Sequence, residues 1–449
     1  MHEELIKTAT QVLDLAKKAG AQQAGVKISR SRFVDVSMRD GEPDKASAST
    51  RRGLSLRLFV DGRFAVHTTS DLRTQGLASF VADAADLTRA LEPDPLRSLP
   101  DPARYPVGSP PELQLYDPDL ARASAEYWAD QAAQMEAACA RAAKEAGPEV
   151  VSVNGGAYGE SAFGYLADSN GFHGVLEETG GFAGCSVVFM DPEQAGKRRS
   201  GWWWEGSRSL SPICGKAKLG SIAKAAVKRG LQELGARPGP SGRFPLVVEN
   251  HAARTLLGHV ISALSGRTLH NKRSYLAGYV DKPVASRLLN LSDQPLLPGG
   301  LGSRWFDAEG AASLPLTLIQ DGRLKNYYLN TYFSRKMGMQ PTVGSTSNIV
   351  LQPSHDQGFQ DMLAGLECGL AVTGFLGGNF NSTTGDFSLG LKGLWIEDGQ
   401  IAHAVEGMNM AGSAMALWHG LSMVGSDPYP FSTTRAPSLR FDDVQLAGA

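Results

Sequence analysis

The sequence contains few cysteines and no long apolar run. Its four cysteines, at positions 139, 185, 214 and 368, are far apart and form no C-x-x-C pair. A disulfide framework or a cysteine-based zinc knuckle is therefore not expected. No stretch of about 20 consecutive apolar residues would span a bilayer, and the acidic, amphipathic amino terminus lacks the apolar core of a signal peptide. We predict reduced, buried thiols, a cytoplasmic location and no membrane partner.

Clustered positive charge is also missing. The formal net charge of the 449-residue chain is -2, and the most basic predicted helix, around residues 216–229, spreads its lysines around its axis. Proteins that bind nucleic acids concentrate Lys and Arg on one face to contact phosphates. Nucleic acid is therefore not expected as a direct partner. With 42% hydrophobic residues, the chain is long enough to bury a large core.

Several catalytic motifs are absent as well. The chain has no G-x-S-x-G nucleophile elbow and no P-loop. The glycine-rich segments 299–302 and 377–380 lack the strand-to-helix context of a phosphate-binding loop. Asp307 and Glu309 flank a predicted turn, so we favour a structural role for them over acid–base catalysis. The run Trp202–Trp204 is predicted to pack at the end of a strand, with an interface role as the alternative.

A strand followed by a helix, residues 244–266, is the segment most informative about function. Phe244–Val248 is an apolar run typical of a buried strand, and helical periodicity begins at Asn250, a residue type that favours the N-cap position. At about 100° per residue the helix has an apolar face and a polar face. The predicted core face comprises Ala253, Leu256, Leu257, Val260, Ile261 and Leu264, and the polar face comprises His251, Arg254, Thr255, Gly258, His259 and Ser262.

The two histidines of this helix do not have the spacing of a zinc-binding pair. His251 and His259 are eight residues apart, which is about 12 Å along a helix axis. Zinc–nitrogen bonds are only about 2 Å long. Ala252 stands where a water-activating Glu would follow the first His. We therefore predict polar-face or interface residues here, not metal ligands.

An unrelated metal site is the alternative interpretation of the histidines. Each of them could join carboxylates or imidazoles that are distant in the sequence, such as Asp307, Glu309 or His270. In that case the chain would be a metal-dependent peptidase with an atypical site.

The first half of the chain repeats an order of predicted elements. A helix, strands joined by Asp-Gly turns and a second helix occupy residues 3–91, and a proline-rich linker spans about residues 93–111. A second unit then has one helix from Pro118 to Gly147, short strands and another helix. Its expected strands are 150–153, 161–167, 173–178 and 185–190, and its last helix is 212–234. This order predicts a duplicated helix and antiparallel-hairpin unit.

The composition changes near residue 235. The segment Gly235–Gly242 is rich in glycine and proline, and the sequence after it is rich in strand and turn patterns, including Asp321-Gly322 and Asp398-Gly399. We predict an N-terminal α+β domain at residues 1–235 and a C-terminal β-rich domain with a few helices at residues 236–449. The fold class is α+β.

Residues 374–406 combine small polar residues with a predicted hairpin. Such a composition suits a strand-lined groove in which an extended peptide adds its own backbone hydrogen bonds. Glycine in this segment permits close approach of a second backbone. The segment therefore indicates a peptide groove.

Four motifs of the chain are informative together: Phe306–Gly310, Asn379–Phe387 with Gly390 after it, Trp395–Gly399 and Pro437–Arg440. They resemble the TldD/PmbA family, also described as modulators of DNA gyrase, and in particular its PmbA (TldE) branch. The resemblance extends over most of the chain, and it is the combination of motifs that is specific.

The resemblance implies a role in peptide degradation. In the active branch, a zinc metallopeptidase has an H-E-x-x-x-H helix and a cysteine ligand from its C-terminal tail, and it pairs with the PmbA branch to degrade or trim unfolded peptides. In this chain the matching positions are His251, Ala252, Leu256 and, near the tail, Val424, and no cysteine follows Cys368. The resemblance thus implies no catalytic residue and no metal ligand in this chain, with zinc in a TldD-like partner.

The resulting hypothesis is a non-catalytic PmbA/TldE-type subunit that contributes to the substrate groove of a zinc metallopeptidase. Whether the chain is itself an enzyme stays open. Two alternative functions are the atypical metal-dependent peptidase described above and a regulatory binding protein of the gyrase-modulator type. A homodimer is the alternative assembly when the partner is absent. The candidate groove residues are His251, Arg254, Asn379, Asn381, Thr384 and Asp386.

Overall fold

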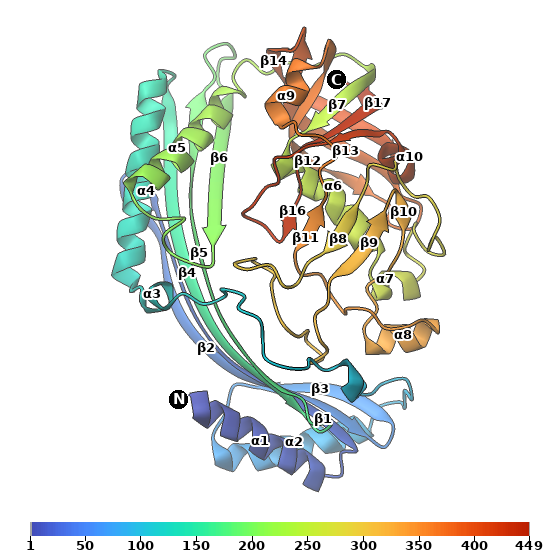
Figure 1. The fold of residues 1–449 in the computed structure, drawn as a ribbon. Coiled ribbons are helices and arrows are strands. Elements are labelled where there is room, and N and C mark those ends of the chain that lie inside the picture. The colour runs from blue at the N-terminus through green and yellow to red at the C-terminus, as the bar shows by residue number, and fades with distance from the viewer. Residues whose placement is uncertain (1, 449) are drawn as a thin grey trace.

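The computed structural model describes residues 2–448, and the first half of the chain forms one long antiparallel sheet (Figure 1). The strand order is β3-β2-β1-β4-β5-β6. The strands are β1 Gln23–Arg39, β2 Glu42–Val60, β3 Arg63–Thr69, β4 Val150–Asp168, β5 His173–Met190 and β6 Arg198–Ser207. Figure 1 shows these strands arching along one side of the molecule, with the C-terminal half in the bend of the sheet.

The two halves of this sheet have the same order of elements. The helices α1 His2–Lys18 and α2 Thr74–Arg89 flank β1–β3 in sequence and share one core with β1 and β2. The helices α4 Ala125–Ala146 and α5 Lys216–Leu231 flank β4–β6 and form a second core with β4 and β5. Because β1 pairs with β4 at the centre, the two units join into a single sheet. The predicted α+β class with two helix-and-strand units is confirmed.

The strands of the second unit are longer than predicted. The segments 150–153 and 161–167 belong to one continuous strand, β4, and 173–178 and 185–190 belong to β5. The intervening glycines do not end the strands, and two of those in β4 make room for α4. A Cβ atom at Gly155 would lie 2.2 Å from the Glu136 backbone nitrogen, and one at Gly159 would lie 2.2 Å from the Trp128 ring.

The prediction of one continuous helix from Pro118 to Gly147 is wrong. The structure has a short helix, α3 Pro118–Arg122, before α4. Ser124 begins α4 as a new N-cap, because its hydroxyl accepts a hydrogen bond from the Tyr127 N–H at 3.2 Å. Arg32 of β1 donates to the Ala123 carbonyl at 2.8 Å, which ties the break to the sheet.

The second half of the chain builds two further sheets. One has the order β14-β13-β12-β7-β17-β15, and the other has the order β10-β9-β8-β11-β16. Their strands are β7 Gly242–Val248, β8 Leu291–Asp293, β9 Leu316–Gln320, β10 Arg323–Leu324, β11 Ile349–Leu351, β12 Cys368–Phe380, β13 Asp386–Glu397, β14 Gln400–Ser413, β15 Leu421–Val424, β16 Thr434–Arg435 and β17 Leu439–Ala447. The helices are α6 Asn250–Ala263, α7 Gly266–His270, α8 Thr331–Met337, α9 Phe359–Ala364 and α10 Ala414–His419.

Two predicted hairpins are present in this half. Asp321 and Gly322 connect β9 to β10, and Asp398 and Gly399 connect β13 to β14. At both turns the two residues have positive φ, for example 48° at Asp398 and 73° at Gly399, as a type I′ turn requires. The largest core of this half includes the apolar face of α6 and residues of β7 and β12. Among residues 2–448, no helix is both long enough and apolar enough to cross a bilayer.

The contact between Gly155 and α4 gives a first prediction. Replacing Gly155 by Ala forces β4 and α4 apart, and we expect a loss of about 1–3 kcal/mol in the free energy of unfolding, as for other overpacked sites. Urea unfolding monitored by circular dichroism measures this loss.

Gly164 is the matched control in the same strand. A Cβ atom there meets its nearest neighbour, the Leu176 carbonyl oxygen, at 3.9 Å. Gly164→Ala is therefore expected to leave stability unchanged or to raise it by about 0.5 kcal/mol. Equal losses for the two variants would contradict the close packing of α4 on β4.

Candidate functional site

The start of α6 places the first candidate residues. Glu249 occupies the N-cap position, so the prediction of Asn250 as N-cap is wrong by one residue. The Asn250 side-chain amide instead donates to the Asp427 carbonyl at 2.7 Å, and its backbone N–H donates to Ser438 Oγ at 3.1 Å. These bonds attach the first turn to the C-terminal segment. The core face is largely as predicted: Ala252, Ala253, Leu256, Leu257, Val260, Ala263 and Leu264 are buried, whereas Ile261 is half-buried.

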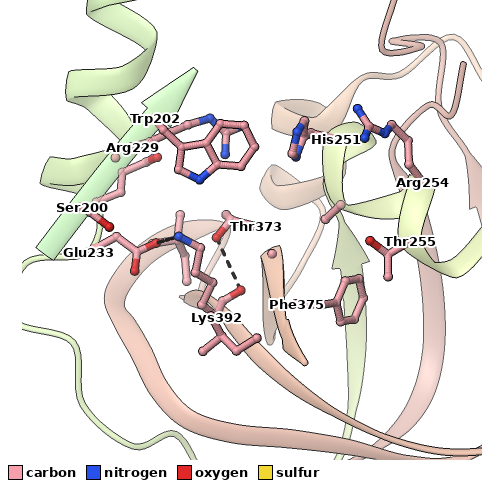
Figure 2. Close-up of a pocket in the computed structure, with 16 residues that line it drawn as sticks. Ser200, Trp202, Arg229, Glu233, His251, Arg254, Thr255, Thr373, Phe375 and Lys392 are labelled. Carbon is pink, nitrogen blue, oxygen red and sulfur yellow. Dashed lines mark hydrogen bonds and ion pairs between the residues drawn. The ribbon is translucent and has the colours of Figure 1, made fainter. Parts of the chain in front are cut away.

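A cavity of about 380 Å³ lies next to this first turn (Figure 2). It is lined by segments from both halves of the chain, which are far apart in the sequence. Its wall residues include Ser200 and Trp202 of β6, Arg229 of α5, Glu233 after α5, His251 and Arg254 of α6, Phe375 and Leu376 of β12 and Lys392 of β13.

His251 is surrounded by aromatic rings. The centroid of its imidazole lies 4.9 Å from that of Trp202, 5.8 Å from that of Trp203 and 5.1 Å from that of Tyr429. Burial, and then the nearby charges of Arg254, Arg229 and Lys392, lower the pKa of His251 to about 4. The imidazole is therefore neutral at pH 7.

Three cationic side chains line the cavity, and two of them are paired. Arg229 forms an ion pair with Glu249, and Lys392 Nζ lies 3.1 Å from Glu233 Oε1. The Arg254 guanidinium lies over the Tyr429 ring, 5.1 Å from its centroid. Among residues 2–448, no carboxylate lies within ion-pair distance of Arg254. The wall thus carries more positive than negative charge.

The positions that would match a zinc motif do not form a ligand set. Ala252 and Leu256 are buried in the α6 core, and Val424 is fully buried in β15. Within the described part of the chain, no group of three His, Cys, Asp or Glu residues is arranged to hold a metal ion. The residues around His251 therefore do not fit zinc, which requires three or four donor side chains.

The residues of the alternative metal site are engaged elsewhere. His259 stacks on Phe380 with the centroids 4.0 Å apart, and His270 lies against Phe333. Asp307 Oδ1 accepts hydrogen bonds from the Glu309 and Ala311 backbones, as expected for a turn. Glu309 Oε2 accepts hydrogen bonds from the Thr331 N–H and hydroxyl.

The loop residues predicted for the groove lie away from the cavity. Asn379, Asn381, Thr384 and Asp386 are exposed. Asn381 Oδ1 accepts a hydrogen bond from the Thr383 N–H at 3.0 Å, and Thr384 Oγ1 donates to Asp386 Oδ2 at 2.6 Å. The neighbouring Phe380 stacks on His259, which is about two helical turns from His251. The structure thus brings His251 and Arg254 to the cavity and leaves the other four outside it.

Sequence reasoning missed most of the wall residues, among them Arg229, Lys392 and Trp202. Arg229 and Lys392 lie on amphipathic elements whose charges suggest a solvated surface, and only the fold brings them to α6. Trp202 did carry a signal, because three adjacent tryptophans are unusual and an interface role was one of the two roles predicted for them. In the structure Trp202 is 40% exposed. An exposed tryptophan in a strand indicates a contact surface.

Comparison with known proteins identifies the fold and its relatives. Models of the PmbA/TldA metallopeptidase match residues 24–88 (domain 1), 118–234 (central domain) and 241–448 (C-terminal domain). The chain is 27% identical to metalloprotease PmbA of Escherichia coli O157:H7 over 452 residues, which cover 99% of this chain and 96% of the relative. Relatives named metalloprotease TldD homologues match over 52% of this chain.

Solved structures agree with this assignment. A Bacteroides thetaiotaomicron protein named as a modulator of DNA gyrase superposes with a TM-score of 0.92 at 35% identity, covering 99% of this chain and 98% of that one. TldE from Thermococcus kodakarensis shares the fold, with a TM-score of 0.85 at 20% identity over 98% of this chain and 100% of that one. The chain therefore belongs to the PmbA/TldD metallopeptidase family and to its PmbA branch.

Proposed function

We propose that this chain is the non-catalytic, PmbA/TldE-type subunit of a two-protein zinc metallopeptidase that degrades or trims unfolded peptides. The observation that carries the proposal is the setting of His251, the one matching histidine of the zinc motif. It is enclosed by Trp202, Trp203 and Tyr429, while the motif's other positions are held by the buried side chains of Ala252 and Leu256.

The charges around His251 also oppose a metal ion there. Arg254, Arg229 and Lys392 are near enough to lower the pKa of its imidazole. Like charges repel, and a divalent ion experiences twice the repulsion of a single charge. One imidazole does not supply the three or four donor side chains that zinc requires, so we assign zinc to the TldD-like partner.

The role in the groove rests on the cavity and on the exposed loop. His251 and Arg254 supply polar groups to a cavity between the two halves of the chain. Asn379, Asn381, Thr384 and Asp386 present polar side chains at the opposite end of α6. We propose that both places face the peptide when the TldD-like subunit closes the groove. A division into domains 1–235 and 236–449 is part of this proposal, and it is supported by the separate sheets on either side of residue 235.

The zinc assignment can be tested by purifying the chain alone and with its companion. We expect the chain alone to contain less than stoichiometric zinc and to leave an unstructured peptide uncut, because the ligand set is incomplete. Co-purification from native cells is expected to recover a companion with a complete H-E-x-x-x-H motif, and the pair is expected to cut the peptide in a chelator-sensitive way. Stoichiometric zinc and chelator-sensitive cleavage by the chain alone would refute the proposal.

The protonation of His251 can be measured by NMR. We expect its Cε1–H resonance to titrate with a midpoint near pH 4, because burial and three cations lower its pKa from 6.5 to about 4. The unfolded chain takes up this proton at a higher pH than the folded chain, so acidification from pH 6.5 to about 4 lowers the free energy of unfolding.

The variant His251→Gln is the control for this pH dependence. It removes the titrating group, so its free energy of unfolding should fall less than that of the wild type over the same pH range. A midpoint near 6.5, with equal pH dependence for both proteins, would show that the imidazole is open to solvent.

A regulatory binding protein is the second candidate. Structural relatives from Bacteroides thetaiotaomicron and Thermotoga maritima are named as modulators of DNA gyrase. With a net charge of -2, contact with a protein is more plausible than direct contact with DNA. A pull-down that recovers a topoisomerase and no zinc-motif relative would favour this candidate.

A further inference from the structure

One wall of the cavity is the free edge of a sheet. β6 is the last strand of its sheet, and among residues 2–448 it pairs only with β5. The Tyr429 hydroxyl donates to the Trp204 carbonyl at 3.0 Å, so this carbonyl is directed away from β5. Alternate residues of an antiparallel strand direct their N–H and C=O groups to the same side. The backbone groups of Trp202 and Ser200 are therefore also directed away from β5, and both residues line the cavity.

The opposite end of the cavity carries an uncompensated positive charge. Arg229 and Lys392 each have a carboxylate partner, whereas Arg254 is held only by the Tyr429 ring among the described residues. Figure 2 shows Trp202, His251 and Arg254 following one another along one wall. An anion that enters beside His251 therefore reaches a guanidinium with no competing internal carboxylate.

A carboxylate matches this guanidinium. Arginine binds carboxylates through two parallel N–H···O bonds, which are stronger than hydrogen bonds between neutral groups. The unpaired edge of β6 offers donors and acceptors to an extended backbone. The exposed face of Trp202 adds an apolar surface. A peptide that carries a carboxylate fits all three features.

We propose that this cavity is a subsite for the carboxylate-bearing part of an extended peptide, with Arg254 binding the carboxylate and the edge of β6 pairing with the peptide backbone. The subsite rests on the proposed function, because it names the substrate group that the groove of this chain receives. The carboxylate is either the C-terminal one or an acidic side chain.

Calorimetry with three matched peptides tests the subsite. The first is a short acetylated peptide of Ser, Ala and Thr with a free C-terminal carboxylate, the second is its C-terminal amide, and the third is the amide with one internal Glu. Each is titrated into the full-length chain, alone and together with its companion subunit. We expect the free acid to bind about 10- to 100-fold more tightly than the plain amide, as for a charge-assisted pair.

The third peptide identifies the source of the carboxylate. Binding as tight as that of the free acid assigns the subsite to acidic side chains as well, and binding as weak as that of the plain amide assigns it to the C-terminus. Either result supports the proposal if Arg254→Gln removes the difference between the carboxylate peptide and the plain amide.

Two controls separate the subsite from general effects. Arg267 is exposed on α7 and outside the cavity wall, so Arg267→Gln should leave all affinities unchanged. Methylation of the peptide backbone nitrogens at alternate residues blocks pairing with β6, so we expect one of the two methylation registers to lower affinity at least tenfold. This second control leaves the protein itself unchanged.

The remaining outcomes distinguish this inference from the function on which it rests. Equal affinities for acid and amide, unchanged in Arg254→Gln, would overturn the subsite while leaving a peptide groove in place. Absence of binding by any peptide, to the chain alone or with its companion, would overturn both.

Discussion

The packing of His251 between Trp202, Trp203 and Tyr429 is the contact on which the geometry of the cavity depends, because it joins the two halves of the chain. The two tryptophans belong to β6 at the edge of the long sheet, whereas His251 and Tyr429 belong to the C-terminal half. Arg199 of β6 adds a second connection, since it lies 2.8 Å from Asp191 and 2.6 Å from Glu406 of β14. Lys392 and Glu233 add a third. The cavity is a space between two bodies, so its shape is set by how the long sheet rests against the C-terminal sheets.

The same contact determines the electrostatic character of the cavity. An aromatic enclosure with cations nearby keeps the imidazole of His251 neutral, so it does not add charge to a wall that already contains Arg229, Arg254 and Lys392. The two internal carboxylates, Glu233 and Glu249, neutralise two of the three cations. What is left is one cation, Arg254, that has no carboxylate partner among residues 2–448. A related helix with a Glu after the first histidine would differ, because a carboxylate there would compensate a bound metal ion.

Local patterns in the sequence predicted which helices and strands form. They did not predict how long the strands are or which elements pack against one another. Interactions between near neighbours in the chain can be read from the sequence. They determine the Asp-Gly turns, the first helix and the buried face of α6. The long strands β4 and β5 do not follow in this way, because glycines such as Gly155 and Gly159 weaken a strand in isolation and become favourable only once α4 lies against them. Only two residues of the cavity wall were predicted, for a similar reason. His251 and Arg254 lie on one helix face, whereas Trp202, Arg229 and Lys392 reach that face only through tertiary structure.

The duplicated unit explains why the cavity forms at one edge of the long sheet. The repeat places β3 and β6 at equivalent outer edges, and an unprotected edge strand tends to pair with other chains. β6 faces the C-terminal half. The Tyr429 hydroxyl donates a hydrogen bond to the Trp204 carbonyl, and Arg199 forms ion pairs with Asp191 and Glu406. The rest of the edge, at Ser200 and Trp202, borders a cavity of about 380 Å³. The contacts of Tyr429 and Arg199 therefore protect most of this edge against pairing with other chains.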